Sequence, residues 1–434
     1  MAVIVIKNSV YRFLYKLAIL CKPLVSSFVP SKIRKRVRNL LTNQAASTPN
    51  IVVSSYGRNG RNFKDGINLV GYCRAEMGVG ESCRAAARSM NAAGIPFGIL
   101  NFKGTSSARM ADLTWQHKEV VDPEYGINIF HINAEEMKDV YAYYGPSLFE
   151  GRYNIGFWHW ELPDFPDEWL VNFSYLQEIW VPSTFVADSI SLKSPIPVVK
   201  IPHSIEVVIN ENRDRSYFGL PEGSFLFLSM YDIKSFQERK NPKAAIEAFK
   251  LSFRPDDMSV GLVVKINKPG GKSSDLMEIK QLIAEYQNIY LIDRTISRND
   301  VNALISVTDC FISLHRSEGF GLVIAEAMYL AKPVIGTNWS STTDFMNHNN
   351  SCLVDYELVA LGEDYGPYKA YQYWANPKIS HASEYMIKLV NDQEYYRKLA
   401  EEGERYIKQY HSPEKIGKLI YERLAYIKKF KFGG

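Results

Sequence analysis

Cysteine is scarce in this chain: its 434 residues contain five, an odd number, and no two have Cys-x-x-Cys spacing. This scarcity argues against a disulfide framework and against a zinc site built on cysteine pairs. Histidines and cysteines also form no cluster with the spacing of metal ligands. The sequence therefore predicts a reducing compartment, which we take to be the cytoplasm, and no metal site.

Long apolar runs are absent as well. No stretch reaches the roughly 18 uninterrupted apolar residues that a transmembrane helix needs. The nearest approach, Tyr11–Pro30, is interrupted by Arg12, Lys16 and Lys22, and charges inside the run also argue against a signal peptide. The segment is typical of an amphipathic helix, for which two placements are open: a membrane interface, or the protein's own body.

Acidic residues are missing from the first 64 positions, which hold 12 Lys and Arg, whereas the rest of the chain is net acidic. A basic arm on an acidic body suits an anionic surface. Nucleic acid is disfavoured, because no helix-turn-helix or zinc-finger pattern accompanies the arm. We expect residues 1–65 to form a basic arm and, over residues 42–65, a linker; the arm either holds the protein at the inner face of the plasma membrane or packs on the body.

What the chain does contain is two series of short apolar runs that alternate with helical patterns. Strands are expected at 67–72, 127–132, 153–158, 178–181, 198–201, 225–230, 260–266, 289–292 and 310–314. Helices are expected at 79–93, 242–250, 275–285, 298–307 and 321–330. Such alternation predicts parallel sheets covered on both faces. A polar stretch near residue 210 divides it into domains at 66–210 and 211–405, and a last helix at 406–434 is expected to cross back to the first domain.

The most informative stretch is Ser313–Met328, SLHRSEGFGLVIAEAM, in which a strand ends in a glycine-containing turn and a helix begins. The start of a helix presents free backbone N–H groups and the positive end of a dipole, which together suit an anion. Glu318 lies just before the turn, and Glu326 lies eight residues further on. Two carboxylates in this position suit sugar hydroxyls; on spacing alone, a helix cap and a surface ion pair explain them equally well.

The Glu318-x7-Glu326 block resembles the signature of the retaining GT-B glycosyltransferases of family 4. AKPVIGTNWSSTTDFM resembles the strand and loop that follow in that family, FQERKNPKAAIEAF its phosphate-binding segment, and GYCRAEMGVGESCRAAARSMNAAGI its first strand, glycine loop and helix. The segment from IGFWHWELPDF to VVKIPHSI resembles a branch common in bacterial surface-polysaccharide synthesis. The resemblance covers roughly residues 66–425. It implies two Rossmann-like, doubly wound α/β domains facing a cleft, the first on the acceptor side and the second binding a nucleotide sugar.

The resemblance also implies roles for single residues. Glu326 would bind the ribose hydroxyls of the nucleotide, Glu318 would contact the donor sugar where transfer occurs, and Lys240 would bind the diphosphate. Four backbone N–H groups would lie against sugar and pyrophosphate: those of Gly319, Phe320, Gly321 and Leu322. Gly78 and Gly80 would let the backbone approach the donor without a clashing Cβ. Because these groups stabilise the diphosphate, no Mg²⁺ or other cofactor is expected.

One departure from the family pattern concerns the second positive charge. Many relatives have an Arg on the strand before the lysine, where this chain has Met230, Tyr231 and Asp232. Arg239 or Lys265 would take its place. Lys265 interrupts an apolar strand, which favours a phosphate role at the end of that strand over a lysine that extends out of the sheet.

His159, in the sequence WHWE, follows a predicted strand, and relatives often have a donor-contacting histidine near this point. The alternative is a hydrogen-bonded core histidine between Trp158 and Trp160. Glu161 and Asp164 follow closely and are weaker candidates for a base that activates the acceptor.

Other motifs fit less well. PGGKSS at 269–274 resembles a phosphate loop, but the Walker pattern needs glycine where Ile266 stands. GVGESC at 78–83 lacks the third glycine of a dinucleotide fingerprint. A glycosidase also uses paired carboxylates, but it needs no lysine or helix start directed at a diphosphate.

The resulting hypothesis is a metal-independent, retaining glycosyltransferase that uses a nucleotide-sugar donor and a glycan or lipid-linked acceptor in surface-polysaccharide synthesis. GDP-mannose is the first choice of donor, by analogy with the polysaccharide branch, and UDP-sugars come next. The alternative is a non-catalytic scaffold of the same fold that binds a partner enzyme or a glycan.

Overall fold

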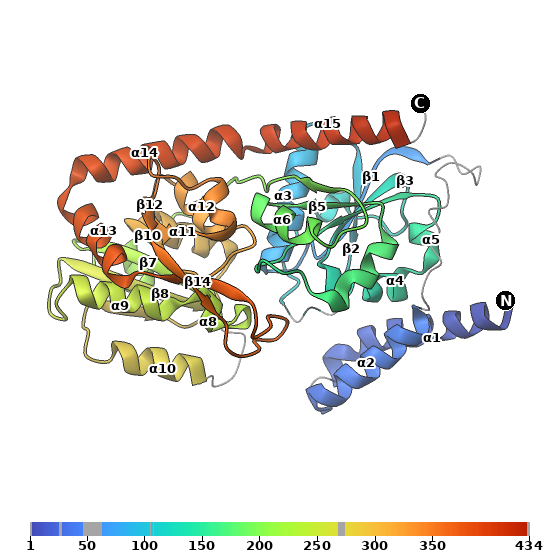
Figure 1. Ribbon diagram of the computed structural model, residues 1–434, viewed down its shortest axis with the longest axis horizontal. Helices are drawn as coiled ribbons and strands as arrows, with labels where there is room; N and C mark the ends of the chain where they lie inside the picture. The colour runs from blue at the N-terminus through green and yellow to red at the C-terminus, as the bar shows by residue number, and fades with distance from the viewer. Residues whose placement is uncertain are drawn as a thin grey trace.

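The computed structural model describes residues 2–25, 28–46, 63–104, 106, 108–267 and 274–431. The chain forms two lobes, each built on a six-stranded sheet, with an N-terminal helical hairpin beside the first lobe (Figure 1). Most of the predicted linker, at 47–62, and most of the PGGKSS segment lie outside the described residues.

The N-terminal sheet has the strand order β2-β1-β3-β4-β5-β6, with every neighbouring pair parallel. Its strands are β1 Lys64–Gly71, β2 Phe97–Asn101, β3 Tyr125–His131, β4 Tyr153–Phe157, β5 Glu178–Val181 and β6 Val198–Lys200. One face is covered by α3 (Gly78–Ala92) and α15 (Pro413–Lys431), the other by α4 (Met137–Tyr144), α5 (Pro146–Phe149) and α6 (Thr184–Ser191). Leu69 and Val70 therefore lie in different cores although they are adjacent in the chain.

The C-terminal sheet has the order β12-β11-β10-β7-β8-β9 and is also parallel. Its strands are β7 Phe225–Asp232, β8 Val260–Asn267, β9 Ile289–Ile292, β10 Cys310–Ser313, β11 Val334–Thr337 and β12 Cys352–Val354. Its helices are α7 Arg215–Phe218, α8 Gln237–Lys240, α9 Pro242–Ser252, α10 Ser274–Ile283, α11 Arg298–Val307, α12 Leu322–Tyr329, α13 Ile379–Asn391 and α14 Gln393–Tyr410. The prediction of two parallel, Rossmann-like sheets is confirmed.

The last helix, α15, continues from α14 along the top of the molecule and lies against the N-terminal lobe (Figure 1). Its apolar residues Ile416, Ile420, Leu424 and Ile427 join the core beside α3. Arg423 donates two hydrogen bonds to the fully buried Glu178 at the start of β5, from Nε at 2.8 Å and from Nη2 at 2.5 Å. The chain therefore crosses between the lobes a second time.

The N-terminal arm is helical. α1 (Ala2–Val25) and α2 (Ser31–Ala45) pack on each other and on α4. The linker predicted from residue 42 onward is wrong at its start, because α2 continues through Ala45, which is buried against Tyr15. Among the described residues, every helix is too short or too polar to cross a lipid bilayer.

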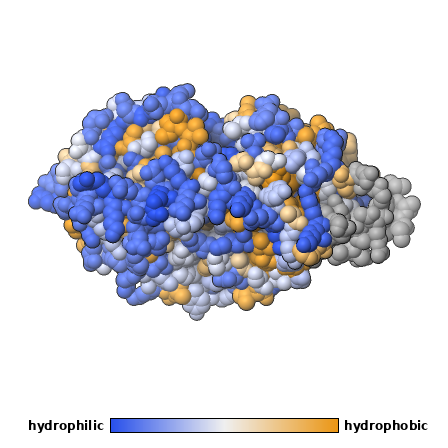
Figure 2. Space-filling model, turned by 90° about the horizontal axis from the view of Figure 1, so that it is seen from above, coloured by the Kyte–Doolittle hydropathy of each residue, from blue (hydrophilic) through white to orange (hydrophobic). Residues whose placement is uncertain are grey.

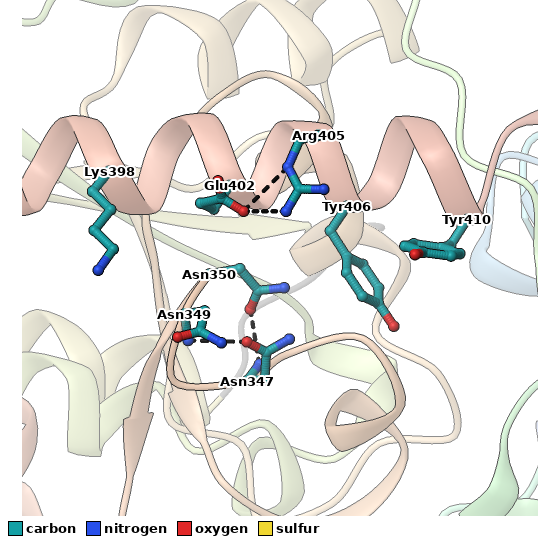
Figure 3. Close-up of a pocket in the computed structure, with 8 residues that line it drawn as sticks. All are labelled: Asn347, Asn349, Asn350, Lys398, Glu402, Arg405, Tyr406 and Tyr410. Carbon is teal, nitrogen blue, oxygen red and sulfur yellow. Dashed lines mark hydrogen bonds and ion pairs between the residues drawn. The ribbon is translucent and has the colours of Figure 1, made fainter.

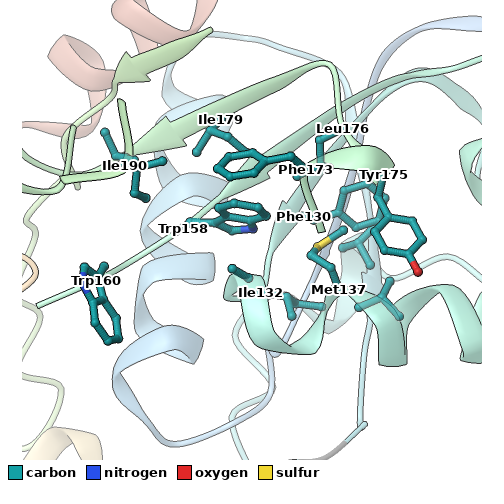
Figure 4. Close-up of a cluster of buried hydrophobic side chains, with 14 of the residues drawn as sticks. Phe130, Ile132, Met137, Trp158, Trp160, Phe173, Tyr175, Leu176, Ile179 and Ile190 are labelled. Atoms are coloured by element: carbon teal, nitrogen blue, oxygen red, sulfur yellow. The ribbon is translucent and has the colours of Figure 1, made fainter. Parts of the chain in front are cut away.

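Sequence patterns did not predict the antiparallel hairpin of β13 (Tyr356–Ala360) and β14 (Tyr373–Pro377), which extends from the C-terminal lobe. Leu361, Tyr368 and Trp374 of this hairpin and its loop belong to the aromatic core of the N-terminal lobe. Figure 4 shows part of that core: Trp158 and Phe173 lie next to each other, and Trp160, which contacts Tyr368, lies further along. The hairpin thus joins the two lobes.

Candidate active site

Glu318 lies between two cations at the carboxyl end of the C-terminal sheet. Lys240 Nζ donates a short hydrogen bond to Glu318 Oε1, and Arg239 Nη1 lies 3.4 Å from Glu318 Oε2. Arg239 Nη1 also donates to the carbonyl oxygen of Ser317 at 2.9 Å. Glu318 and Arg239 are buried, whereas Lys240 is partly exposed. The structure therefore brings together three of the residues predicted for the site.

The backbone holds this cluster in place. Arg239 and Lys240 lie in the short helix α8, which is flanked by Phe236 and Asn241, both with positive φ, at 58° and 51°. Positive φ in residues other than glycine stores strain, which is typical of functional sites. Asn241 Nδ2 donates to the carbonyl oxygen of Leu314 at 3.0 Å, and the Arg316 N–H donates to the carbonyl oxygen of Arg239 at 2.8 Å. Two loops of the C-terminal lobe are thus fixed to each other.

The charges of the cluster keep Glu318 ionised. Burial works against the charged form, but Lys240 and Arg239 outweigh it and lower the pKa of Glu318 to about 2. Its carboxylate therefore accepts hydrogen bonds at neutral pH and does not act as a general acid.

The turn before α12 carries the predicted N–H groups. Gly321 has φ +94°, a conformation that glycine adopts readily, and a Cβ there would come within 2.8 Å of Thr342. A Cβ at Gly319 would come within 3.2 Å of the carbonyl oxygen of Trp160, so the two lobes meet closely here. Among the described residues, the N–H groups of Gly319, Phe320 and Gly321 donate to no protein acceptor. Leu322 begins α12, so this turn presents unpaired donors at a helix start.

Glu326 is buried on α12 and forms an ion pair with Arg298, the first residue of α11. Its Oε2 atom has no hydrogen-bond partner within the described chain. Burial raises the pKa of Glu326 and Arg298 opposes this shift. Arg298 also acts on Glu81 of α3: with Arg88 and Arg84 it outweighs burial and lowers the pKa of Glu81 to about 2. The surface position considered for Glu326 is therefore wrong: Glu326 is buried, and only its partner Arg298 is partly exposed.

Gly78 and Gly80 begin α3 in the N-terminal lobe. A Cβ at Gly78 would meet no atom within 4 Å, so its surroundings are open. A Cβ at Gly80 would lie 2.1 Å from the carbonyl oxygen of Ala75. The close packing of the chain on itself therefore accounts for Gly80 without any ligand.

His159 belongs to a group of three histidines around Ser82. Ser82 Oγ lies 3.2 Å from His131 Nδ1, 3.4 Å from His159 Nε2 and 3.5 Å from His203 Nδ1. His159 Nε2 lies 2.9 Å from His203 Nε2, and His159 Nδ1 lies 3.2 Å from Asn133 Oδ1. Burial lowers the pKa of His159 to about 4, so its ring is neutral at pH 7.

The histidine group reaches the second lobe through Phe320. The rings of His203 and Phe320 are 4.9 Å apart, and Phe320 also packs on Phe345 and His411. No hydrogen bond joins His159 to Glu318 or Lys240 in the described structure. Contact between His159 and the donor sugar therefore stays a prediction. The arrangement fits a hydrogen-bonded core histidine equally well.

Lys265 is separated from this cluster. It lies on β8, and β7 intervenes between that strand and β10, which leads to Glu318. Its side chain is buried, so a lysine extending out to solvent is excluded. Burial lowers the pKa of Lys265 to about 8, partly offset by Asp232. Of the two residues considered for the second positive charge, Arg239 is the one that adjoins Lys240.

Glu161 and Asp164 make contacts between the lobes. Tyr368 of the β13–β14 loop donates to Glu161 Oε2 at 3.0 Å, and Glu161 Oε1 lies 3.9 Å from Arg239 Nη2. Asp164 pairs with Lys193 at 2.5 Å and accepts a short hydrogen bond from Tyr371. Both carboxylates are therefore held by neighbours, which weakens the case for either as a base.

Two further features were considered as functional sites: clusters of metal-ligating residues and a pocket at the surface of the C-terminal lobe. The described residues contain no group of three or more His, Cys, Asp or Glu that fits a metal ion. Figure 3 shows a pocket formed between loop 347–350 and α14. Its walls are Asn347, Asn349, Asn350, Lys398, Glu402, Arg405, Tyr406 and Tyr410, none of which belongs to the Glu318 cluster.

Three important neighbours were not predicted from the sequence: Arg298, Tyr368 and His203. For Arg298 a signal existed, because a cation in the first turn of a helix opposes the helix dipole and needs a partner. Tyr368 lies in a loop whose hairpin was not recognised. His203 lies in the family-like segment VVKIPHSI, after the short strand β6, but no role was predicted for it.

Comparison with known proteins agrees with this geometry. Residues 211–406 match the family described as glycosyl transferases group 1. The chain is 24% identical over 233 residues to N-acetyl-alpha-D-glucosaminyl L-malate synthase of Bacillus anthracis. That match covers 50% of this chain and 53% of the relative, so the chain spans about half the length of the curated relative it matches.

Among solved structures, Anabaena Alr3699/HepE in complex with UDP and glucose superposes with a TM-score of 0.63 at 14% identity, over 83% of this chain and 100% of that one. Sucrose-phosphate synthase from Thermosynechococcus elongatus gives 0.59 at 13% identity, over 84% and 99%. Residues 211–406 thus resemble glycosyl transferases group 1, within a chain whose two facing Rossmann-like domains form the GT-B fold.

Proposed function

We propose that this protein is a retaining glycosyltransferase that transfers a sugar from a nucleoside diphosphate donor to a hydroxyl of a glycan or lipid-linked acceptor. The observation that carries the proposal is the position of Glu318 between Arg239 and Lys240, next to the unpaired N–H groups of the turn before α12. The family match over residues 211–406 supports it.

The chemistry follows from charge. Breaking a sugar–nucleotide bond develops negative charge on the diphosphate, and preorganised cations and N–H dipoles lower that barrier. Lys240 and the turn at Gly319–Gly321 would receive the diphosphate, and Glu318 would accept hydrogen bonds from the sugar. Arg239 is buried against Glu318 and keeps the carboxylate ionised. These groups supply the stabilisation that Mg²⁺ gives in other enzymes, so we propose that no metal is needed.

The nucleotide would be held at Glu326. Its unpaired, buried Oε2 suits a ribose hydroxyl, since a buried acceptor without a partner carries a penalty of about 1–3 kcal/mol that a ligand removes. Arg298 already fixes the other carboxylate oxygen. The carboxylate is therefore oriented before the nucleotide arrives.

For the base of the donor nucleotide we propose two candidates, uracil and guanine. GDP-mannose was the first choice from the sequence, whereas the Anabaena structures contain UDP and UDP-glucose. We therefore place UDP-sugars alongside GDP-mannose as donors.

The acceptor would belong to surface-polysaccharide synthesis. Because the name of the Bacillus anthracis relative joins a glucosaminyl group to malate, small hydroxy acids are a second class of acceptor to test.

A thermal-shift screen with UDP, GDP, ADP and the matching nucleotide sugars, in EDTA, tests the proposal. One nucleoside diphosphate should raise the unfolding temperature, and its sugar form should then release nucleotide when an acceptor is added. A non-catalytic scaffold would be favoured by two results together. One is that a nucleotide raises the unfolding temperature but no acceptor causes nucleotide release; the other is that Lys240→Ala shows the same unfolding temperature with nucleotide as the wild type. No response to any nucleotide would contradict donor binding itself.

A further inference from the structure

The N-terminal hairpin, formed by α1 and α2, is fixed to the body through a polar residue of α4. Tyr15 Oη donates to Asp139 Oδ1 at 2.6 Å, and Thr42 Oγ1 donates to the same atom at 3.1 Å. Arg38 Nε lies 3.6 Å from it. Tyr15, Leu41 and Ala45 are buried around these contacts. The hairpin is therefore a folded part of the N-terminal lobe, held by one side of each helix.

The other side of the hairpin is apolar and uncovered. In α1, Tyr11, Tyr15 and Ile19 recur at steps of four and face the body, whereas the exposed residues recur on the opposite side of the helix. The exposed set on the hairpin is Val10, Phe13, Leu14, Leu17, Leu20, Leu24, Val25, Phe28, Ile33, Val37 and Leu40. Eleven large apolar side chains on one small element mark an interaction surface, because soluble proteins rarely expose a contiguous patch of this kind.

The charge of the hairpin indicates what covers this surface. Residues 1–64 contain no acidic side chain, and Lys32, Lys35 and Arg36 are exposed on α2. An anionic bilayer attracts these cations and also accepts the apolar side chains. A second copy of the chain fits less well, since two hairpins would bring like charges together. By contrast, the side of the molecule that carries α14 and α15 is mainly hydrophilic (Figure 2).

We propose that the α1–α2 hairpin is a membrane-docking element that lies flat in the interface of an anionic bilayer, with its exposed apolar side chains inserted and its lysines and arginines at the headgroups. No helix among the described residues can span the bilayer, so attachment is peripheral. The two placements predicted for this segment, on a membrane or on the protein's own body, are compatible. One side of the hairpin packs on α4, and the other side is free to bind lipid. This docking is independent of which donor the cleft takes.

Co-sedimentation with vesicles tests the apolar surface. The full-length protein should pellet with vesicles of phosphatidylglycerol and phosphatidylcholine in equal parts. The triple variant Leu17→Ser, Leu20→Ser and Leu24→Ser should bind at least a hundredfold more weakly, since each exposed leucine contributes about tenfold when buried in the bilayer. The matched control is Val121→Ser, Leu192→Ser and Leu251→Ser, three exposed apolar residues elsewhere, which should bind as the wild type does.

The charges are tested in the same assay. Lys32→Glu, Lys35→Glu and Arg36→Glu together should abolish pelleting with anionic vesicles, since each cation near the leaflet contributes about fivefold. Reversing Lys398, Lys415 and Lys418 to Glu is the control, which should leave pelleting unchanged. Wild-type binding should weaken as salt rises and be small on phosphatidylcholine alone.

Two results would overturn the proposal. One is unchanged vesicle binding by the leucine variant, with its circular dichroism and melting temperature at the wild-type values. The other is a dimer of the wild-type protein in light scattering that the leucine variant converts to a monomer; the surface would then be an interface between copies.

Discussion

Arg298 and Glu326 form an ion pair that connects the first residue of α11 to the middle of α12. The Glu326 carboxylate is buried, the Arg298 side chain is partly exposed, and one oxygen of Glu326 is left without a partner in the described chain. The positive charge of Arg298 also lowers the pKa of Glu81 in the other lobe. Charges of both domains therefore act on the proposed ribose site.

Glu326→Gln should weaken binding of the preferred nucleoside diphosphate by about ten- to a hundredfold, because a charge-assisted hydrogen bond contributes about 1.5–3 kcal/mol. Glutamine keeps the size of the side chain and limits damage around Arg298. Isothermal titration calorimetry measures the loss, with the exposed Glu278→Gln as control. An affinity equal to that of the wild type would remove Glu326 from the site.

Lys240→Ala should lower kcat by an order of magnitude or more and affect KM less, because charge on the leaving diphosphate grows in the transition state. Lys243→Ala is the matched control, a lysine three residues away that pairs with Glu278 at the surface. Steady-state rates of nucleotide release provide the measurement. If Lys265→Ala loses turnover while Lys240→Ala retains it, the two lysines have been assigned in the wrong order.

On acidification the protein should begin to lose stability at a pH well above the pKa of its carboxylates. Burial lowers the pKa of both His159 and His315 to about 4, against 6.5 in the unfolded chain. Between those values the unfolded state binds more protons, so the stabilisation is complete above pH 6.5 and is lost as pH falls towards 4. Each histidine contributes a slope of about 1.4 kcal/mol per pH unit.

Urea unfolding of the wild type and of His315→Gln at pH 7, 6 and 5 checks this dependence. The variant should lose one histidine's share of the slope. Parallel curves for the two proteins would show that His315 does not titrate in this window.

Arg423→Met should destabilise the N-terminal lobe by about 3–5 kcal/mol, because it leaves the fully buried Glu178 without its cation. Thermal unfolding followed by circular dichroism measures the effect. Arg405→Met, which removes an exposed pair with Glu402, should shift the midpoint little. Equal shifts in both variants would show that α15 is not held through Arg423.

The sequence predicted best where periodicity and local motifs decide the structure. The strands Glu178–Val181 and Ile289–Ile292 and the helix Arg298–Val307 have their predicted limits, since each is a short apolar or amphipathic run between polar segments. The β13–β14 hairpin was missed because β13 is short and has no buried residue, and the hairpin packs on the other lobe through Leu361, Tyr368 and Trp374.

Contacts between segments that are distant in the sequence could not be predicted either. The family motif placed Glu318, Lys240 and Glu326, but nothing in the local sequence pairs Arg298 with Glu326, or Tyr368 with Glu161. For Lys265, strand position alone suggested a phosphate role, and only the strand order shows that β7 separates it from Glu318.

The most direct test of the central claim is a ³¹P NMR titration of the nucleoside diphosphate selected by the screen, in EDTA, with wild type and Lys240→Ala. The account predicts that the β-phosphorus resonance shifts and broadens with the wild-type protein and that the Lys240→Ala change largely removes this effect. An unperturbed β-phosphorus resonance with the wild type, or the same perturbation with both proteins, would contradict a diphosphate site at Lys240 and the start of α12.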